Sequence, residues 1–126
     1  MFRSMLTELL EKLPHARAAI FCDHEGESVD CAAAPTNPDG ARSLSEYDVK
    51  ICGAQLAASW LLLDERARLE GAGRILELEL RAEQGTFLCH AVQDGYYLVV
   101  MLSASPGVSR AARTLRAAVP KFAKEM

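Results

Sequence analysis

The stretch ICGAQLAASWLLL, residues 51–63, contains no charged residue, although a quarter of this 126-residue chain is charged. Asp48 and Lys50 stand just before it, and Asp64 and Glu65 follow it directly. A helix that is apolar on every side is covered by other protein rather than by water. The stretch therefore raises the question of what covers it.

Local signals set the ends of this helix. Ser45 is a favoured N-cap residue, and Glu46 and Asp48 occupy the first turn, where the helix dipole favours negative charge. The helix is expected to run to about Arg68 and to stop before Gly71. Helical spacing predicts that the stripe on a sheet consists of Ile51, Cys52, Leu56, Trp60 and Leu63.

The other sides of this helix are also apolar. Burying a leucine is worth roughly 1.5–3 kcal/mol, and an exposed apolar patch is typical of an interface. We therefore predict that a second protein surface covers this helix, most simply in a twofold homodimer. The alternative is a helix covered by the chain's own loop and helices. The predicted contact residues on the helix are Ala54, Ala57, Ala58, Trp60, Leu61 and Leu62.

The segments before this helix predict another helix and a hairpin. Residues 2–13 place apolar residues three and four positions apart, as an amphipathic helix does, and the proline that follows ends it. Two short extended segments, 18–22 and 28–32, flank Gly26, which can supply the positive φ of a tight turn. Residues 33–44 are predicted to form a long loop.

The segments after this helix predict three strands and a final helix. RILELELRA, residues 74–82, alternates leucine with charged residues and so has one buried and one wet face. TFLCHAV (86–92) and YYLVVMLS (96–103) follow, and the second is apolar on both faces, which is typical of a central strand. The last helix begins near Val108, and Pro120 predicts a kink or a restart within it.

The predicted element order is α-β-β-α-β-β-β-α, a mixed α/β (α+β) fold in one domain, residues 1–126. Consecutive strands joined by tight turns pair antiparallel. A single sheet with helices on both faces explains why the last strand is apolar on both sides.

The charged residues of the strand at 74–82 are further candidates for partner contact. Glu77, Glu79 and Arg81 share one face, because side chains two positions apart on a strand point the same way. In one interpretation they protect a sheet edge from unwanted pairing. In the other, two copies pair through this strand, and Glu79 or Glu77 faces the partner's Arg81. Such pairs contribute about 0.2–1 kcal/mol, which fixes register but does not drive association.

Composition argues against several classes of function. A net charge of −3 argues against a nucleic-acid binder. The uncharged segment is shorter than the roughly 20 apolar residues of a membrane span, and no signal peptide opens the chain, so a cytoplasmic protein without a membrane span is expected. The cysteines, which form no C-x-x-C pair and are expected to be reduced and buried, are Cys22, Cys31, Cys52 and Cys89.

No catalytic grouping, cofactor site or metal site is predicted, so we expect a protein that is not an enzyme. Cys89 and His90 are adjacent on a strand, point to opposite faces and cannot act as nucleophile and base. A zinc site at Cys22 and His24 has little support from spacing. A small-molecule sensor would need a cavity with convergent polar groups, whereas the apolar segment offers mainly Gln55 and Ser59.

Arginines supply the remaining candidates. Arg110, Arg113 and Arg116 line one side of the last helix, where they form either a solvated face or a contact with an acidic protein surface. An arginine finger for a GTPase needs an exposed arginine that reaches a phosphate. Arg42, in the loop at 33–44, is the best placed for that role.

The chain resembles the Roadblock/LC7 family over nearly its whole length. The resemblance is carried by the order and apolar patterning of the leucine-striped first helix and of four segments: AAIFCDHEGESVDCA, ICGAQLAASWLLLDERARLEG, ILELELRAEQGTFLCHAV and DGYYLVVMLSASPG. It implies a five-stranded antiparallel sheet of order 2-1-5-4-3 between helices. It also implies a homodimer in which strand 3 and helix 2 lie against their copies.

Within the family, the short tail resembles the bacterial MglB/MglC-type polarity regulators of gliding motility. This resemblance implies a non-enzymatic dimeric adaptor that binds a small Ras-like GTPase, another Roadblock-type regulator, or both. Two alternatives stay open: a GTPase-activating co-regulator, and a small-molecule sensor domain of mixed α/β fold.

Overall fold

The computed structural model describes residues 1–23, 25–34, 44–93, 95–104 and 107–126. Along the chain the elements are α1 (Phe2–Glu11), β1 (Ala16–Asp23), β2 (Ser28–Ala33), α2 (Glu46–Leu69), β3 (Glu77–Ala82), β4 (Gly85–Gln93), β5 (Tyr96–Ser103) and α3 (Val108–Lys124). The predicted element order and mixed α/β class are confirmed.

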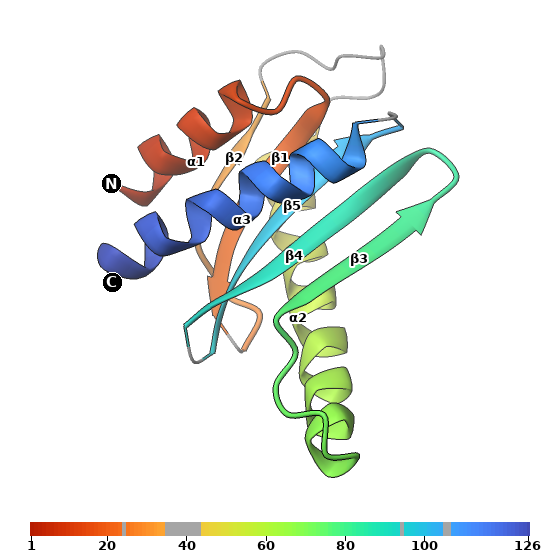
Figure 1. Ribbon diagram of the computed structural model, residues 1–126. Helices are drawn as coiled ribbons and strands as arrows, with labels where there is room; N and C mark the ends of the chain where they lie inside the picture. Colours follow the sequence, from red (N-terminus) through yellow and green to blue (C-terminus); the bar gives the residue numbers. More distant parts are fainter. Residues whose placement is uncertain (24, 35–43, 94, 105–106) are drawn as a thin grey trace.

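The strands form one antiparallel sheet in the order β2-β1-β5-β4-β3, as expected. Helices α1 and α3 lie side by side on one face of the sheet, and α2 lies on the other face (Figure 1). The two chain termini meet at the same end of the molecule. β5 is central, and β3 and β2 are the two edge strands.

Two apolar cores lie on the two faces of the sheet. One core fills the space under α1 and α3, where Leu6, Phe21 and Phe122 are almost completely buried. The other lies under α2 and contains Ile20 and Trp60. Because β1 and β5 contribute alternate residues to each core, both strands are apolar on both faces, as predicted for the last strand.

The turn between β1 and β2 packs against α2 at Gly26. The carboxylate of Asp23 accepts hydrogen bonds from the backbone N–H groups of Glu25 and Glu27. Gly26 has φ +84°, which confirms the predicted positive φ. A Cβ at this position would lie 3.0 Å from the Cα of Ala54, so Gly26 is also required by the close packing of the turn on α2.

Two expectations from the sequence need correction, and others concern residues that the structure does not describe. α1 ends at Glu11 rather than at residue 13, because Lys12 already caps the helix. α3 does not restart at Pro120 and runs through it to Lys124, since Phe122 is 1% exposed and anchors the last turn in the core. Most of the loop predicted at 33–44 lies outside the described residues, namely positions 35–43 with Arg42, and so do the turn residues His24, Asp94 and Pro106.

Candidate protein-interaction surface

Helix α2 is closed at both ends by the local signals read from the sequence. Ser45 Oγ accepts the N–H of Asp48 at 3.0 Å, and the Asp48 carboxylate accepts the N–H of Ser45 at 3.2 Å, which completes a capping box. At the other end Gly71 has φ +82° and donates its N–H to the carbonyl of Arg68. The helix ends at Leu69, one residue beyond the predicted end.

The side of α2 that faces the sheet differs from the predicted stripe. Its buried residues are Val49, Gly53, Ala57 and Trp60. The prediction that Ile51 and Leu63 face the sheet is wrong, since they are 42% and 46% exposed. A Cβ at Gly53 would lie 3.2 Å from the side chain of Ile20, so this glycine lets α2 pack closely on β1 with this side toward the sheet.

Two of the predicted contact residues therefore pack within the chain. Ala57 and Trp60 are each 3% exposed, and the Trp60 ring lies 4.8 Å from the Tyr97 ring of β5. Buried side chains are not available to a partner in this conformation. Their role is to hold α2 on the sheet, and this revises their assignment as contact residues.

The remaining predicted residues of α2 are open to solvent. Leu61 is 47% exposed and Leu62 is 69% exposed, and Ala54 and Ala58 are exposed as well. The part of the chain that the structure describes does not cover this side of the helix. The alternative of a helix buried by its own chain therefore has no support from these residues. Figure 1 shows that the C-terminal part of α2 extends past the end of the sheet.

Strand β3 presents leucines on the same face of the sheet as α2. Leu78 pairs with Cys89 and Leu80 with Phe87, and both partners belong to the α2 side. Leu80 is 39% exposed because α2 packs on β1 and β2 and leaves β3 uncovered. Leu76, just before the strand, is 54% exposed. These leucines were not predicted as contact residues, since alternation alone implied that they were buried.

The charged face of β3 points toward α3. Arg116 of α3 donates two hydrogen bonds to the carboxylate of Glu77, which lowers the pKa of that carboxyl. His90 Nε2 lies 3.3 Å from the same carboxylate. Arg81 donates to Glu79 at 3.0 Å on its own strand. The predicted Glu77, Glu79 and Arg81 thus share one face, and each already has a partner within its own chain.

Asp64 connects the end of α2 to the start of β3. Its carboxylate accepts the backbone N–H of Ile75 at 2.7 Å and the Arg68 side chain at 2.9 Å. The Ile75 hydrogen bond is the main cause of the lowered pKa of Asp64. This connection ties the C-terminal part of α2 to Ile75, the residue before Leu76. We name the combined surface the α2–β3 surface: Ile51, Ala54, Ala58, Leu61, Leu62, Leu76 and Leu80.

The described residues offer little for chemistry elsewhere. No group of three or more His, Cys, Asp or Glu residues among them could hold a metal ion. Burial raises the pKa of the Cys22 and Cys89 thiols to about 12, which suppresses the reactive thiolate. The hollow lined by Trp60, Asp64 and Tyr97 has a volume of about 30 Å³, far below that of a small-molecule site. In the described part of the chain, no helix has both the length and the apolar character required to cross a membrane.

Comparison with solved structures identifies the architecture. Two structures of MglB, the gliding protein of Thermus thermophilus and one described as having a tetrameric arrangement, each match with a TM-score of 0.82 at 17% identity. Each match covers 96% of this chain and 84% of the other. A Roadblock/LC7 domain from Streptomyces avermitilis matches with a TM-score of 0.78 at 12% identity, over 94% of this chain and 92% of the other.

The chain has the Roadblock/LC7 fold. MglC from Myxococcus xanthus matches with a TM-score of 0.70 at 22% identity, over 99% of this chain and 98% of the other. No family model matches the sequence, and no curated protein does. In this Roadblock/LC7 fold, the α2–β3 surface combines an open apolar helix side with an uncovered edge strand.

Proposed function

We propose that this protein is a non-enzymatic homodimeric regulator that acts as an adaptor in a bacterial polarity or motility module built on a small Ras-like GTPase. The observation that carries the proposal is the α2–β3 surface, in which Leu61 and Leu62 of α2 are exposed and the edge strand β3 is left uncovered on the same face of the sheet. The likeness in fold to MglB and MglC supports the choice of module.

Twofold pairing through this surface would cover both the unpaired backbone edge of β3 and the exposed apolar residues of α2. The outer backbone groups of β3 would pair with those of a second β3, which removes an exposed sheet edge. The two α2 helices would then lie on the same face of the joined sheet, where their leucines and those of β3 meet. Glu79 and Arg81 would lie at the junction between the two β3 strands. Because they already form an ion pair with each other within one chain, they would contribute little to the register of the two strands.

Partner proteins would bind on the paired α2 helices. A second Roadblock-type regulator is a candidate because it has the same sheet edge and helix, and a small Ras-like GTPase is the candidate that the module implies. Both would act with the protein in the cytoplasm. The fold neighbour described as MglB with a tetrameric arrangement is an example of assembly beyond a dimer by a chain of this fold.

Oligomeric state tests the core of this proposal. Analytical ultracentrifugation at micromolar concentration should show a dimer, and Leu61→Asp should give a folded monomer. Val29→Asp is the matched control, because Val29 is 44% exposed and lies on β2 at the opposite edge of the sheet. A wild-type protein that stays monomeric at this concentration would refute the homodimer.

A hydrolysis assay separates the adaptor from the alternative of GTPase activation. The Ras-like GTPase of the same cell is assayed alone and with the protein at saturating concentration. An unchanged rate together with binding by ultracentrifugation is the adaptor result, and a strongly raised rate would overturn it in favour of activation. The sensor alternative gains no support from the hollow lined by Trp60 and Tyr97, because its volume of about 30 Å³ is far below that of a small-molecule site.

A further inference from the structure

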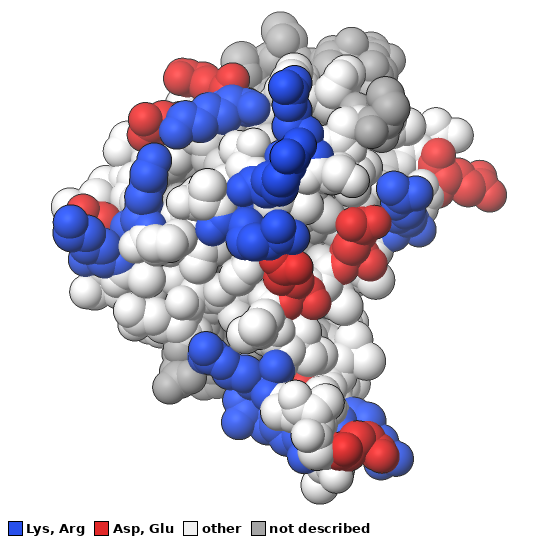
Figure 2. All heavy atoms as spheres, viewed as in Figure 1, with Lys and Arg blue, Asp and Glu red and all other residues white. Residues whose placement is uncertain are grey.

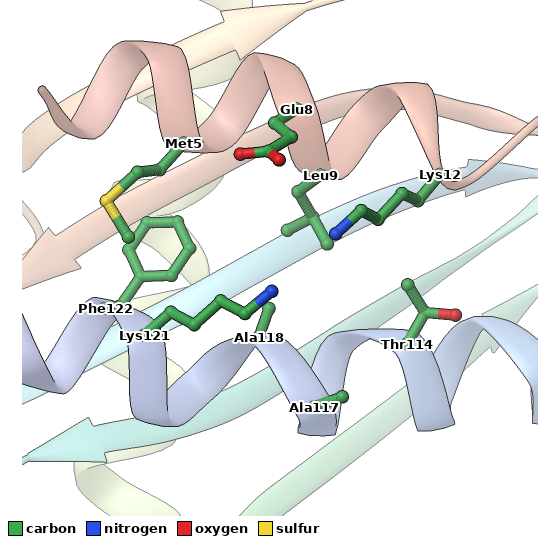
Figure 3. A pocket seen from close by; sticks show the side chains of 9 residues that line it. All are labelled: Met5, Glu8, Leu9, Lys12, Thr114, Ala117, Ala118, Lys121 and Phe122. Carbon is green, nitrogen blue, oxygen red and sulfur yellow. The ribbon is translucent and has the colours of Figure 1, made fainter.

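A groove runs between α1 and α3 on the face of the sheet opposite α2. Figure 3 shows one hollow of this groove, whose volume is about 210 Å³. A second hollow of about 200 Å³ lies between the end of α1 and the start of α3. Lys12 borders both hollows, and we name the two hollows together the α1–α3 groove.

The floor of the α1–α3 groove is apolar. Leu9 and Phe122 are buried beneath the first hollow, and Ala118 lies beside them. Ala111 and Leu102 line the second hollow. Ala111 and Ala118 are about two helical turns apart on α3, or roughly 10 Å along the helix axis.

The edges of this groove are positively charged. The side chains of Lys12 and Lys121 extend from opposite helices into the first hollow, where Glu8 is the one carboxylate among the lining residues (Figure 3). Figure 2 shows basic side chains gathered over α3. Among the described residues, Arg116 forms an ion pair with Glu77, whereas no ion pair within 4.0 Å involves Arg110 or Lys121.

This concentration of positive charge contrasts with the chain as a whole, which has a net charge of −3. Unpaired cations beside a recessed apolar floor favour a ligand that is both acidic and apolar. A helix with one apolar row fits such a groove, because its anchors recur at i, i+3, i+4 and i+7. Ala111 of one hollow and Ala118 of the other are separated by the same seven residues as the i and i+7 anchors.

We propose that the α1–α3 groove binds an acidic amphipathic helix of a partner protein. Two apolar side chains of that helix, seven residues apart, occupy the two hollows, and carboxylates between them face Lys12 and Lys121. The groove lies on the face of the sheet opposite the α2–β3 surface, so both surfaces can be occupied at once. This second partner site is independent of the proposed dimer.

A membrane surface fits the groove less well than a helix does. Binding in the plane of a bilayer needs large apolar side chains that protrude beside the basic residues. In the described chain, the large exposed apolar residues of this region are the terminal Met1 and Met126, whereas Met5, Leu9 and Phe122 are recessed. A recessed floor receives a protruding side chain and not a flat surface.

The test uses a fluorescein-labelled helical peptide with two leucines at i and i+7 and glutamates between them. Binding to the full chain is followed by fluorescence anisotropy at low and high salt. A peptide with lysines in place of the glutamates is the charge control. We expect the acidic peptide to bind more tightly than the basic one, and more weakly as salt rises. Equal binding of the two peptides would overturn the proposal.

Variants assign the binding to the groove. The double variant Lys12→Glu/Lys121→Glu is expected to bind the acidic peptide about tenfold more weakly, since each exposed charge pair contributes up to about a factor of five. Ala118→Trp, which fills the first hollow, should also weaken binding. Lys50→Glu makes one Lys→Glu change on α2, outside the groove, and should leave the affinity unchanged. Circular dichroism checks that each variant is folded.

Two further measurements separate the possible failures. Leu61→Asp, which targets the dimer surface, should bind the peptide as the wild type does. Loss of dimerisation and loss of peptide binding can therefore be measured independently. Vesicles containing phosphatidylglycerol test the membrane. Binding to these vesicles without binding to the acidic peptide would overturn the proposal, as would an affinity that the double variant leaves unchanged.

Discussion

Replacing Leu62 by aspartate should weaken the proposed dimer by a predictable amount. Full burial of a leucine is worth about 1.5–3 kcal/mol. Leu62 is 69% exposed in the single chain, so about two thirds of that free energy, roughly 1–2 kcal/mol, is still available on association. A twofold dimer buries the residue once in each copy, which doubles the effect to about 2–4 kcal/mol. The dissociation constant should rise by about 30-fold to several hundredfold.

Sedimentation equilibrium over a series of protein concentrations measures this change. Because Leu62 is largely exposed already, the stability of the single chain should change by no more than about 0.5 kcal/mol in urea at concentrations where the protein is monomeric. Val29→Asp, a change at the opposite sheet edge, should leave the dissociation constant unaltered. A dissociation constant unchanged in Leu62→Asp, or raised equally in Val29→Asp, would refute the reasoning.

Three further measurements test other parts of the structure. Gly26→Ala should destabilise the fold in urea by more than Gly73→Ala, because both glycines have positive φ but only Gly26 packs against the backbone of α2; equal losses would contradict the close packing. The lowered pKa of Glu77 adds stability that is lost as the pH falls through its folded-state pKa. Arg116→Met should therefore make the free energy of unfolding depend less on pH at acid pH. An unchanged dependence on pH would show that the hydrogen bond contributes nothing. Cys89, with a pKa of about 12, should resist iodoacetamide at neutral pH until the chain unfolds, as mass spectrometry would detect, and rapid labelling of the folded chain would disprove its burial.

Elements with local signals were predictable from the sequence. The start of α2 follows from the reciprocal bonds of Ser45 and Asp48, which are only three residues apart, and its end follows from the positive φ of Gly71. β5 has the predicted bounds, Tyr96–Ser103. Its central position was also predictable, because a strand that is apolar on both faces belongs in the centre of a covered sheet.

The candidate site was predicted less completely. The sequence indicated that α2 has an apolar side with no cover, and Leu61 and Leu62 are indeed exposed. It did not indicate which side that is, because nearly every position from 51 to 63 is apolar or small, and such a pattern does not define the rotation of a helix. Ala57 was therefore placed on the open side, although it is buried, and Ile51 was placed on the sheet, although it is exposed.

By itself, the sequence determined the elements, their order and the presence of an uncharged helix in need of cover, since these depend on caps, turns and periodicity within a few residues. Only the tertiary structure decided which side of α2 stays open, because that depends on Gly53 meeting Ile20, a contact between distant parts of the chain. It also decided that Leu80 of β3 is uncovered and that Arg116 holds Glu77, since both follow from where the helices lie across the sheet.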